Sequence, residues 1–336
     1  MNKKTFIIAE MSGNHNGDIK RAKEIIKIAK EVGADAVKLQ TYTADSLTLN
    51  CDGDDFVEKG LLWKGMRSYD LYMQAHTPWE WHEELFDYAR SLDLVCFSTP
   101  FDFAAVDLLE SLGNPIYKIA SFEITDVNLI RYAASKSKPM IISTGVSTMD
   151  DLQMAVDVCH EVGNNDITFL KCTSAYPAPL DKANLRTIPF LADKFGVKVG
   201  VSDHSLSDTI PTTAVALGAC AVEKHLMIDR KLGGPDSGFS LEPAEFERMV
   251  KAIRDVESAL GTVYCPTDPT EIVGRHSCRS LYVAEDIKKG EVFTGKNVRS
   301  VRPGYGLHPK YLSEVLGKVA ARDLEMGERF SLDMVK

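Results

Sequence analysis

The sequence predicts an α/β protein built on a closed (β/α)8 barrel and followed by a small β-rich domain. Eight short apolar segments alternate with amphipathic helical patterns, and nearly every apolar segment ends in polar residues. Apolar strands that alternate with helices indicate a parallel sheet covered on both faces. Eight such units over about 260 residues fit a closed barrel better than an open sheet.

The predicted strands are apolar except near their carboxyl ends. They lie at residues 6–10, 36–40, 95–99, 116–120, 140–144, 167–171, 198–202 and 221–225. Helices are predicted where apolar residues recur at a spacing of three and four. These patterns lie at residues 19–29, 81–91, 103–112, 127–135, 150–162, 184–194, 209–217 and 243–260.

One connection is much longer than the others. About forty residues, Thr41–Trp79, separate the second strand from its helix, and they are rich in aromatic residues. A connection of this length in a compact domain is usually a lid or a binding loop. A disordered insertion is the alternative, which the aromatic content disfavours.

The domain boundaries follow from composition. Residues 1–262 are predicted to form the barrel, and the polar stretch 263–278, with two prolines, reads as a linker. Residues 279–336 have short strand patterns, turn residues and no room for a long helix. Some sixty residues form only a marginal core, so we expect this module to pack against another surface.

Composition excludes several protein classes. The chain has 336 residues, 44% of them hydrophobic and 26% charged, which is typical of a globular enzyme. A net charge of −9 argues against general nucleic-acid binding. No apolar run approaches the roughly 20 residues that span a bilayer, and residues 5–9 are too short for a signal-peptide core, so we expect a cytoplasmic location.

The seven cysteines show no CxxC spacing and are expected to be reduced thiols. Four of them lie in apolar runs and are interpreted as small residues that fill the core. These are Cys96, Cys159, Cys172 and Cys220.

Two neighbouring strands lead into polar clusters that each contain a histidine. Strand 198–202 leads into SDH, with His204, and strand 221–225 ends in EKH, with His225. Parallel strands lie about 4.8 Å apart, so the two imidazoles are predicted to reach one divalent ion at about 2.0–2.2 Å each. The alternative is that each histidine is an ordinary hydrogen-bonded residue at a strand end.

Three lysines, Lys38, Lys118 and Lys171, lie within otherwise apolar strands. A buried ammonium without a partner is costly. One interpretation pairs these lysines with strand-end carboxylates such as Glu10 and Glu123. The one we favour has them converge with hydroxyl groups on a phosphate or carboxylate, because hydroxyls beside lysines offer several donors to anionic oxygens. The hydroxyls concerned belong to Thr99, Ser121, Ser143 and Ser202.

A divalent ion beside an anion pocket predicts carbonyl chemistry on a phosphorylated substrate. Glu10 and Glu123 are candidates for a general acid or base, or for binding substrate hydroxyls. Asp236, in the turn after the last strand, would either bond a sugar or only stabilise the turn.

The remaining histidines are weaker candidates. His15 is expected to line the site, and His76 and His82 flank the aromatic segment of the long connection, where they could meet a substrate. Surface or packing positions are predicted for His160, His276 and His308.

Two other classes of function stay open. A Schiff-base keto-acid aldolase would use Lys118 or Lys171 to form an imine. A non-catalytic protein would bind carbohydrate or ice through the C-terminal module, with the barrel as a scaffold. The paired histidines and the hydroxyl-rich strand ends are unnecessary for either, so both are disfavoured.

A series of motifs runs along the whole chain. They are AEMSGNHNG, VKLQTY, FSTPFD, YKIASFEI, STG, KCTSAYP, SDHS, EKH and GGPDS, then DIKKGEVFTGKNV and RPGYG. With these motifs the chain resembles the sialic-acid synthase family over essentially its full length. The resemblance implies an enzyme that condenses phosphoenolpyruvate with an N-acylated amino sugar, giving a nine-carbon sugar acid and phosphate by C–O cleavage. It also implies a C-terminal antifreeze-like (SAF, β-clip) domain.

The resemblance implies roles for matching residues. His204 and His225 would hold Mn²⁺ or Mg²⁺, with Co²⁺ as a further candidate, and Glu10 and Glu123 would act with them at the reacting centre. Arg302 would reach the active site of the other subunit in a domain-swapped homodimer. Phosphoenolpyruvate would contact Lys38, Thr99, Lys118, Ser121, Ser143 and Ser202. The sugar would contact Gln40, Ser174, Tyr176 and Asp236.

Within this family the chain looks most like the branch of pseudaminic acid synthases, through TPWEWH, FSLEP, RSLY and LHPKYL. The implied sugar is 2,4-diacetamido-2,4,6-trideoxy-altrose, for a flagellin or surface glycan. N-acetylneuraminate and legionaminate synthases are the alternatives. The N-acetylneuraminate synthases commonly have an asparagine at the position of Ser174, a departure that weakens that alternative.

Overall fold

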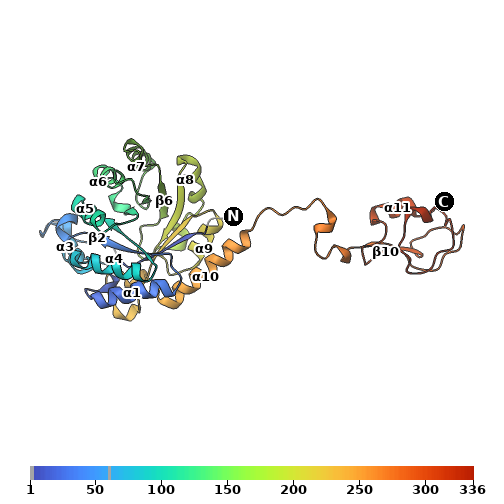
Figure 1. Cartoon of the computed structure of the whole chain (residues 1–336), viewed down its shortest axis with the longest axis horizontal. Coiled ribbons are helices and arrows are strands. Elements are labelled where there is room, and N and C mark those ends of the chain that lie inside the picture. The colour runs from blue at the N-terminus through green and yellow to red at the C-terminus, as the bar shows by residue number, and fades with distance from the viewer. Residues whose placement is uncertain (1–3, 60–61) are drawn as a thin grey trace. The chain divides into compact units, whose positions relative to one another are not determined.

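The computed structural model describes residues 4–59 and 62–336. This part of the chain forms two compact units, one running up to Gly261 and the other comprising Thr262–Lys336. Figure 1 follows them along the chain, from blue at the N-terminus to red at the C-terminus.

Eight parallel strands close the first unit into a barrel, and β1 pairs with both β2 and β8. The strands are β1 (Phe6–Glu10), β2 (Ala36–Thr41), β3 (Val95–Pro100), β4 (Tyr117–Ile119), β5 (Met140–Ser143), β6 (Ile167–Cys172), β7 (Lys198–Asp203) and β8 (Ala221–His225). Their residues are almost all buried, as expected for strands enclosed by helices outside and side chains inside. The predicted (β/α)8 fold is confirmed, because the strands follow one another around the barrel in chain order.

Helices surround the barrel (Figure 1). They are α1 (Ile19–Glu31), α4 (His82–Ser91), α5 (Phe103–Ser111), α6 (Val127–Ala134), α7 (Met149–Glu161), α8 (Thr187–Phe195), α9 (Thr209–Ala216) and α10 (Pro243–Leu260). Several begin at a side-chain cap: Asp18, Asp102, Asp126 and Thr148 each accept a hydrogen bond from a first-turn N–H. Among the described residues, no helix is both long and apolar enough to span a bilayer.

The long connection after β2 is more ordered than a loop. Apart from residues 60–61, which lie outside the described part, it contains the helices α2 (Ala44–Leu47) and α3 (Ser68–Ala75). We call residues 42–80 the inserted segment. The interpretation as a wholly disordered insertion is therefore wrong.

Two buried histidines hold the ends of the inserted segment against the barrel. The ring of His82 donates from Nδ1 to the carbonyl of Pro78 (3.1 Å), and its Nε2 lies 2.8 Å from the hydroxyl of Thr41. The ring of His15 accepts at Nδ1 from the Gly17 N–H (3.1 Å) and lies 3.2 Å from the Thr77 hydroxyl through Nε2. Both imidazoles are neutral at pH 7, because burial lowers the pKa of each ring to about 4.

The second unit is β-rich, as predicted. Strands β9 (Ser280–Val283) and β10 (Val298–Val301) pair antiparallel, and the helix α11 (Leu312–Val315) is a single turn. This unit has its own apolar core, in which the rings of Phe293 and Phe330 pack edge to face with centroids 5.1 Å apart.

Candidate active site

A cavity of about 500 Å³ opens at the carboxyl ends of the barrel strands. Its size is that of a small-molecule site, and this end of a barrel is where reactive residues gather. Fourteen of the predicted site residues line it: Glu10, Lys38, Gln40, Thr99, Lys118, Ser121, Glu123, Ser143, Ser174, Tyr176, Ser202, His204, His225 and Asp236. The geometry thus brings together residues that are up to 226 positions apart in sequence, between Glu10 and Asp236.

The pleat of the strands explains which polar side chains face the cavity. Residues two apart on a strand point to the same side. On β2, Lys38 and Gln40 line the cavity together, and on β8 Glu223 does so with His225. Lys224, between these last two residues, does not line the cavity.

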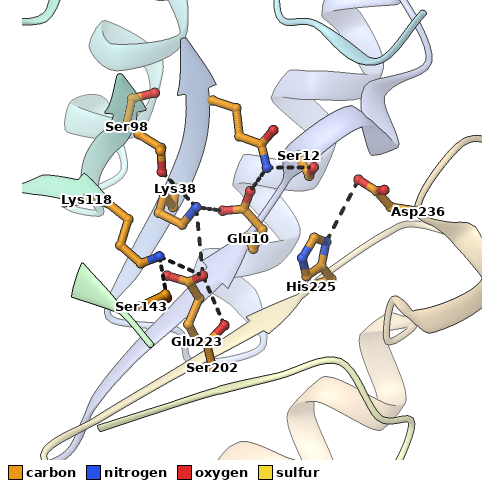
Figure 2. A network of polar contacts seen from close by, with 12 residues as sticks. Glu10, Ser12, Lys38, Ser98, Lys118, Ser143, Ser202, Glu223, His225 and Asp236 are labelled. Atoms are coloured by element: carbon orange, nitrogen blue, oxygen red, sulfur yellow. Dashed lines mark hydrogen bonds and ion pairs between the residues drawn. The ribbon is translucent and has the colours of Figure 1, made fainter. Parts of the chain in front are cut away.

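Lys38 lies at the centre of the polar network shown in Figure 2. Its Nζ is 2.6 Å from Oε2 of Glu10 and 3.1 Å from the hydroxyl of Thr99, and it lies 3.8 Å from Oε1 of Glu223. The Gln40 amide donates to the other Glu10 oxygen at 2.9 Å. The alternative of lysine–carboxylate pairing therefore holds for Lys38 and Glu10.

Lys118 makes a second buried group with a different carboxylate. Its Nζ donates to the Ser143 hydroxyl (2.7 Å) and lies 3.7 Å from Oε1 of Glu223 (Figure 2). The Ser202 hydroxyl donates to the same Glu223 oxygen at 3.3 Å. Glu223 thus bridges both cavity lysines, whereas Glu123, the second carboxylate proposed from sequence as a lysine partner, makes no direct pair with either lysine in the described structure.

A glycine leaves room beside these donors. Gly145 follows β5, and its N–H donates to the Ser121 hydroxyl at 3.1 Å. A Cβ at Gly145 would lie 2.1 Å from Oγ of Ser174 and 2.8 Å from Oγ of Ser121. Only glycine permits these hydroxyls to crowd against the backbone, so a concentrated set of donors faces the cavity next to Lys118.

Burial changes the acidity of the cavity carboxyl groups. Burial raises the pKa of Glu10 to about 7, although Lys38 opposes the shift, and burial also raises the pKa of Glu123 to about 7. For Glu223 the two lysines outweigh burial and hold its pKa below the usual range. Glu10 and Glu123 are therefore suited to proton exchange near neutral pH, while Glu223 stays ionised.

The two strand-end histidines face each other, with ring centroids 5.3 Å apart. His204 Nδ1 lies 3.1 Å from the carbonyl of Thr173, which can only accept, so Nδ1 carries a proton. Burial lowers the pKa of His204, but the contacts with Cys172 and Thr173 outweigh burial and raise it above 6.5. His225 Nδ1 is buried, has no hydrogen-bond partner among the described residues and lies 4.0 Å from Oδ2 of Asp236 (Figure 2). Burial and nearby cations hold the pKa of His225 well below 6.5.

These features fit a divalent metal bound by two imidazoles. A neutral, buried and unpartnered ring nitrogen on His225 is the form in which histidine binds metals, and the Thr173 carbonyl orients His204 as a supporting partner would. No cluster of three or more His, Cys, Asp or Glu side chains with ligand geometry occurs within residues 4–59 and 62–336.

Several sequence interpretations need correction. Lys171 does not line the cavity and donates to the Thr173 hydroxyl at 2.8 Å, because it is Cys172 that faces inward from β6. Cys172 is consequently part of the cavity wall and not core filler. His15 and His82 are wrong as lining residues, since both are buried against the inserted segment, and His76 lies outside the lining as well.

Arg302 lies in the second unit, where its side chain is exposed. Its predicted role in another subunit's site stays a prediction.

Sequence reasoning missed two parts of the cavity. Glu223 was given no role, although the two-residue repeat that brings His225 inward also brings Glu223 inward. The second part is the apolar wall that the inserted segment contributes. The sequence predicts a binding loop there, but no local pattern indicates which of its residues face the cavity. The members of this wall are Tyr42, Leu47, Trp63, Leu71, Tyr72 and Ala75.

Comparison with known proteins agrees with this geometry. The NeuB family model matches residues 25–264, and the SAF domain model matches residues 279–336. The chain belongs to the NeuB family. The resemblance to sialic-acid synthases that the motifs indicate is thereby confirmed, as is the assignment to an enzyme family.

Several relatives of this NeuB chain are similar over nearly its whole length. The pseudaminic acid synthase of Campylobacter jejuni (strain 81-176) is 49% identical, covering 97% of this chain and 95% of its own. That of Helicobacter pylori is 47% identical, covering 98% and 97%. The N,N'-diacetyllegionaminic acid synthase of Legionella pneumophila is 38% identical, covering 96% and 92%.

Solved structures of related proteins have the same fold. The spore coat polysaccharide biosynthesis protein SpsE of Bacillus subtilis superposes with a TM-score of 0.67 at 34% identity, covering 100% of this chain and 96% of its own. The N-acetylneuraminic acid synthetase of Leptospira borgpetersenii, solved with citrate, gives 0.72 at 30% identity over 80% and 90%.

The two neutral histidines that anchor the inserted segment, His15 and His82, predict a pH effect on stability. Burial lowers the pKa of His15 and of His82 to about 4, against about 6.5 in an unfolded chain. Between pH 4 and pH 6.5 the unfolded chain binds more protons than the folded chain. The stabilisation that the two histidines give to the folded state is therefore complete above pH 6.5 and is lost as the pH falls toward 4. Glu10 and Glu123, with raised pKa values, have the opposite effect, so a variant must isolate the histidine.

When the pH is lowered from 7.5 to 5, we expect the free energy of unfolding to fall by about 2 kcal/mol less in His82→Gln than in the parent protein. Urea unfolding at the two pH values measures the difference. His160→Gln, at an exposed position on α7, is the control and should follow the parent. Equal acid sensitivity in His82→Gln and the parent would contradict the assignment.

Proposed function

We propose that the protein is a pseudaminic acid synthase, which condenses phosphoenolpyruvate with 2,4-diacetamido-2,4,6-trideoxy-altrose and water to give pseudaminate and phosphate. The observation that carries the reaction is the convergence of Lys38, Lys118 and a set of hydroxyls beside two imidazoles in one cavity. The sugar is supported by the relatives: synthases of pseudaminic acid are 47–49% identical, and those of diacetyllegionaminic acid 37–38%.

Lys38 and Lys118 would bind the anionic groups of phosphoenolpyruvate, together with the hydroxyls of Ser121 and Ser143. The methylene carbon bonds to the aldehyde carbon of the sugar, and the aldehyde oxygen takes up a proton. Water adds to the former enol carbon, and the C–O bond to phosphate breaks. Glu10, with a pKa of about 7 and next to Lys38, is placed to exchange the proton of that water.

We propose Mn²⁺ or Mg²⁺ as the resident ion, held by His204 and His225. When bound, such an ion would polarise the aldehyde oxygen of the sugar. The chain's own part is to keep the His225 imidazole neutral through burial and to orient the His204 ring through the Thr173 carbonyl.

Phosphate release from phosphoenolpyruvate tests the proposed function with three sugars: the altrose derivative, N-acetylmannosamine and the diacetamido precursor of legionaminate. We expect kcat/KM with the altrose derivative to exceed the other two by about 100-fold or more. A higher value with another sugar would assign the chain to that branch. Borohydride reduction with a keto acid should leave no tag on Lys118, in contrast to an imine-forming aldolase.

Trp63 of the inserted segment is expected to contribute to sugar selectivity. Its indole N–H donates to the Pro235 carbonyl (3.0 Å), and its ring lies 5.7 Å from that of Tyr176, which in turn lies 4.5 Å from the ring of His204. If the aldehyde end of the sugar is at the histidines, its 6-deoxy end extends toward this apolar wall. Contact with a methyl group in an apolar pocket is worth roughly 10–200-fold in kcat/KM.

We therefore expect Trp63→Ala to lower kcat/KM for the altrose derivative about 10-fold, mainly through KM, and to narrow its preference over the 6-hydroxy analogue. Steady-state kinetics with both sugars measures this. Met73→Ala is the control, because Met73 lies in the same segment but is 49% exposed and outside the cavity. An unchanged preference in Trp63→Ala would remove Trp63 from sugar recognition.

We propose a barrel (1–262), a linker (263–278) and a SAF domain (279–336) that form a domain-swapped homodimer, with a cytoplasmic location. The exposed side chain of Arg302 would then contact the anionic substrate bound by the other subunit. Mixing inactive Arg302→Ala with inactive Lys118→Met should restore activity, because one of the two sites in each mixed dimer then has both an intact Lys118 and an intact Arg302. Random subunit exchange would make up to about a quarter of all sites active. No recovery after proven subunit exchange would refute the swap.

A further inference from the structure

Lys224 is a buried lysine that lies outside the cavity. It follows Glu223 and precedes His225 on β8, and its side chain is 0% exposed. Its Nζ forms a very short ion pair with Oδ2 of Asp203 and a very short hydrogen bond to the Ser205 carbonyl. It also lies 3.3 Å from the Ser207 carbonyl, so one ammonium group binds most of the segment that follows β7.

The same segment is tied together by its own side chains. The carboxylate of Asp203 accepts from the N–H and the hydroxyl of Ser205, at 2.9 and 3.0 Å. The Ser207 N–H donates to the Ser205 hydroxyl at 3.2 Å. With Lys224 as its central donor, this network fixes the backbone on both sides of His204.

The strand pleat places this network behind the two proposed metal-binding histidines. Asp203 and Lys224 lie opposite each other in the register of β7 and β8. Neither lines the cavity, whereas His204 and His225, the next residue along the chain after each of them, both do. A displacement of either strand end would therefore alter the separation of the two imidazoles, whose centroids are now 5.3 Å apart.

A buried ion pair of this kind is poorly explained by stability alone. The desolvation of two charges offsets much of their attraction, and uncharged replacements of similar size are often as stable. Lysine differs from such replacements in that it donates in several directions at once. Lys224 therefore fixes the position of the backbone around His204.

We propose that Lys224 is a positioning residue that holds His204 and His225 at the separation needed to bind a divalent cation. It touches neither the substrate nor the ion. This role rests on the proposed function, because the cation that the two histidines would bind is part of that function.

The test separates positioning from stability with four variants. Lys224→Met alone leaves the Asp203 carboxylate buried and unpaired, and should lower Tm by roughly 10 °C. The double variant Asp203→Asn/Lys224→Met removes both charges and should recover Tm to within a few degrees. Lys224→Arg keeps the charge without the same donor geometry. Lys198→Met is the matched control, since Lys198 forms an exposed pair with Asp166 at the other end of β7.

Mn²⁺ titration of each metal-free protein by calorimetry is the first measurement. We expect the double variant to bind Mn²⁺ about 10–100-fold more weakly than the parent despite its recovered Tm, Lys224→Arg to be intermediate, and Lys198→Met to match the parent. Parental affinity in the double variant would overturn the positioning role. If the double variant does not fold, parental affinity in Lys224→Arg overturns it and weakened affinity supports it.

Nitrogen chemical shifts of the imidazoles in metal-free, 15N-histidine-labelled protein are the second measurement. At alkaline pH, where the ring is neutral, His204 should show a single tautomer with the proton on Nδ1 in the parent and a mixture in the double variant. If the parent binds no Mn²⁺, the proposed metal site fails, and these shifts alone decide the role of Lys224. An unchanged His204 tautomer in the double variant would then overturn the proposal.

Discussion

Replacing His225 by alanine is expected to reduce phosphate release from phosphoenolpyruvate about a thousandfold or more, while the barrel stays folded. The Nδ1 atom of His225 is buried, neutral and without a hydrogen-bond partner in the part of the chain that the structure describes, which is costly unless the site serves a ligand. If that ligand is the ion that polarises the aldehyde, its loss removes several kcal/mol of transition-state stabilisation. The same variant should lose Mn²⁺ binding measured by calorimetry.

His160→Ala is the matched control for this experiment. His160 is exposed at the last turn of α7, outside the cavity, and its replacement should leave kcat and KM within about twofold of the parent. A His225→Ala enzyme with parental activity would exclude His225 from the reaction. Full activity of the parent in the presence of a strong chelator would exclude the ion itself.

Much of the fold was predictable because barrel strands carry a strong local signal. Each strand is a short apolar run followed by a polar residue, so its position could be read to within about a residue. Element boundaries were harder to predict where no change from apolar to polar residues marks them. The helix expected from Asn184 begins instead at Thr187, because Asn184 has a φ of +45° and cannot start a right-handed helix in that conformation.

The candidate site was predictable to the extent that strand ends converge. The side of a strand to which a side chain points was harder to predict than the position of the strand. The strand β6 (ITFLKC) is buried at every residue, so its burial does not alternate between the two sides. Lys171 and Cys172 were therefore assigned to the wrong sides of the strand. On β8 the information was present, since the inward placement of His225 also implies that of Glu223.

The apolar wall of the cavity was beyond sequence reasoning for a different reason. Trp63 meets Pro235 through a contact that spans 172 residues, and it is set by how the inserted segment folds against the barrel. The anchors of this segment, His15 and His82, looked like substrate ligands because a histidine in a loop carries no sign of burial. The hydrogen bonds of His15 to Thr77 and of His82 to Pro78, together with the packing of Trp81 against His15 at a centroid distance of 5.5 Å, show that they are structural.

Gly145→Ala is expected to raise the KM for phosphoenolpyruvate about 100-fold or more. The added Cβ would lie 2.1 Å from the Ser174 hydroxyl oxygen and 2.8 Å from that of Ser121, closer than any real contact. The hydroxyls must move, and each donor lost to an anionic oxygen costs about 1.5–3 kcal/mol. Steady-state kinetics at saturating sugar measures the change.

The mechanism of this effect can be tested by removing the atom that clashes most. Adding Ser174→Ala to Gly145→Ala should recover part of the lost affinity, because the nearest obstacle to the new methyl group is then absent. Gly295→Ala is the control, since a Cβ there meets nothing within 4 Å and should leave KM unchanged. An unaltered KM in Gly145→Ala would show that phosphoenolpyruvate does not depend on the crowded hydroxyls beside Lys118, and the anion pocket would have to lie elsewhere in the cavity.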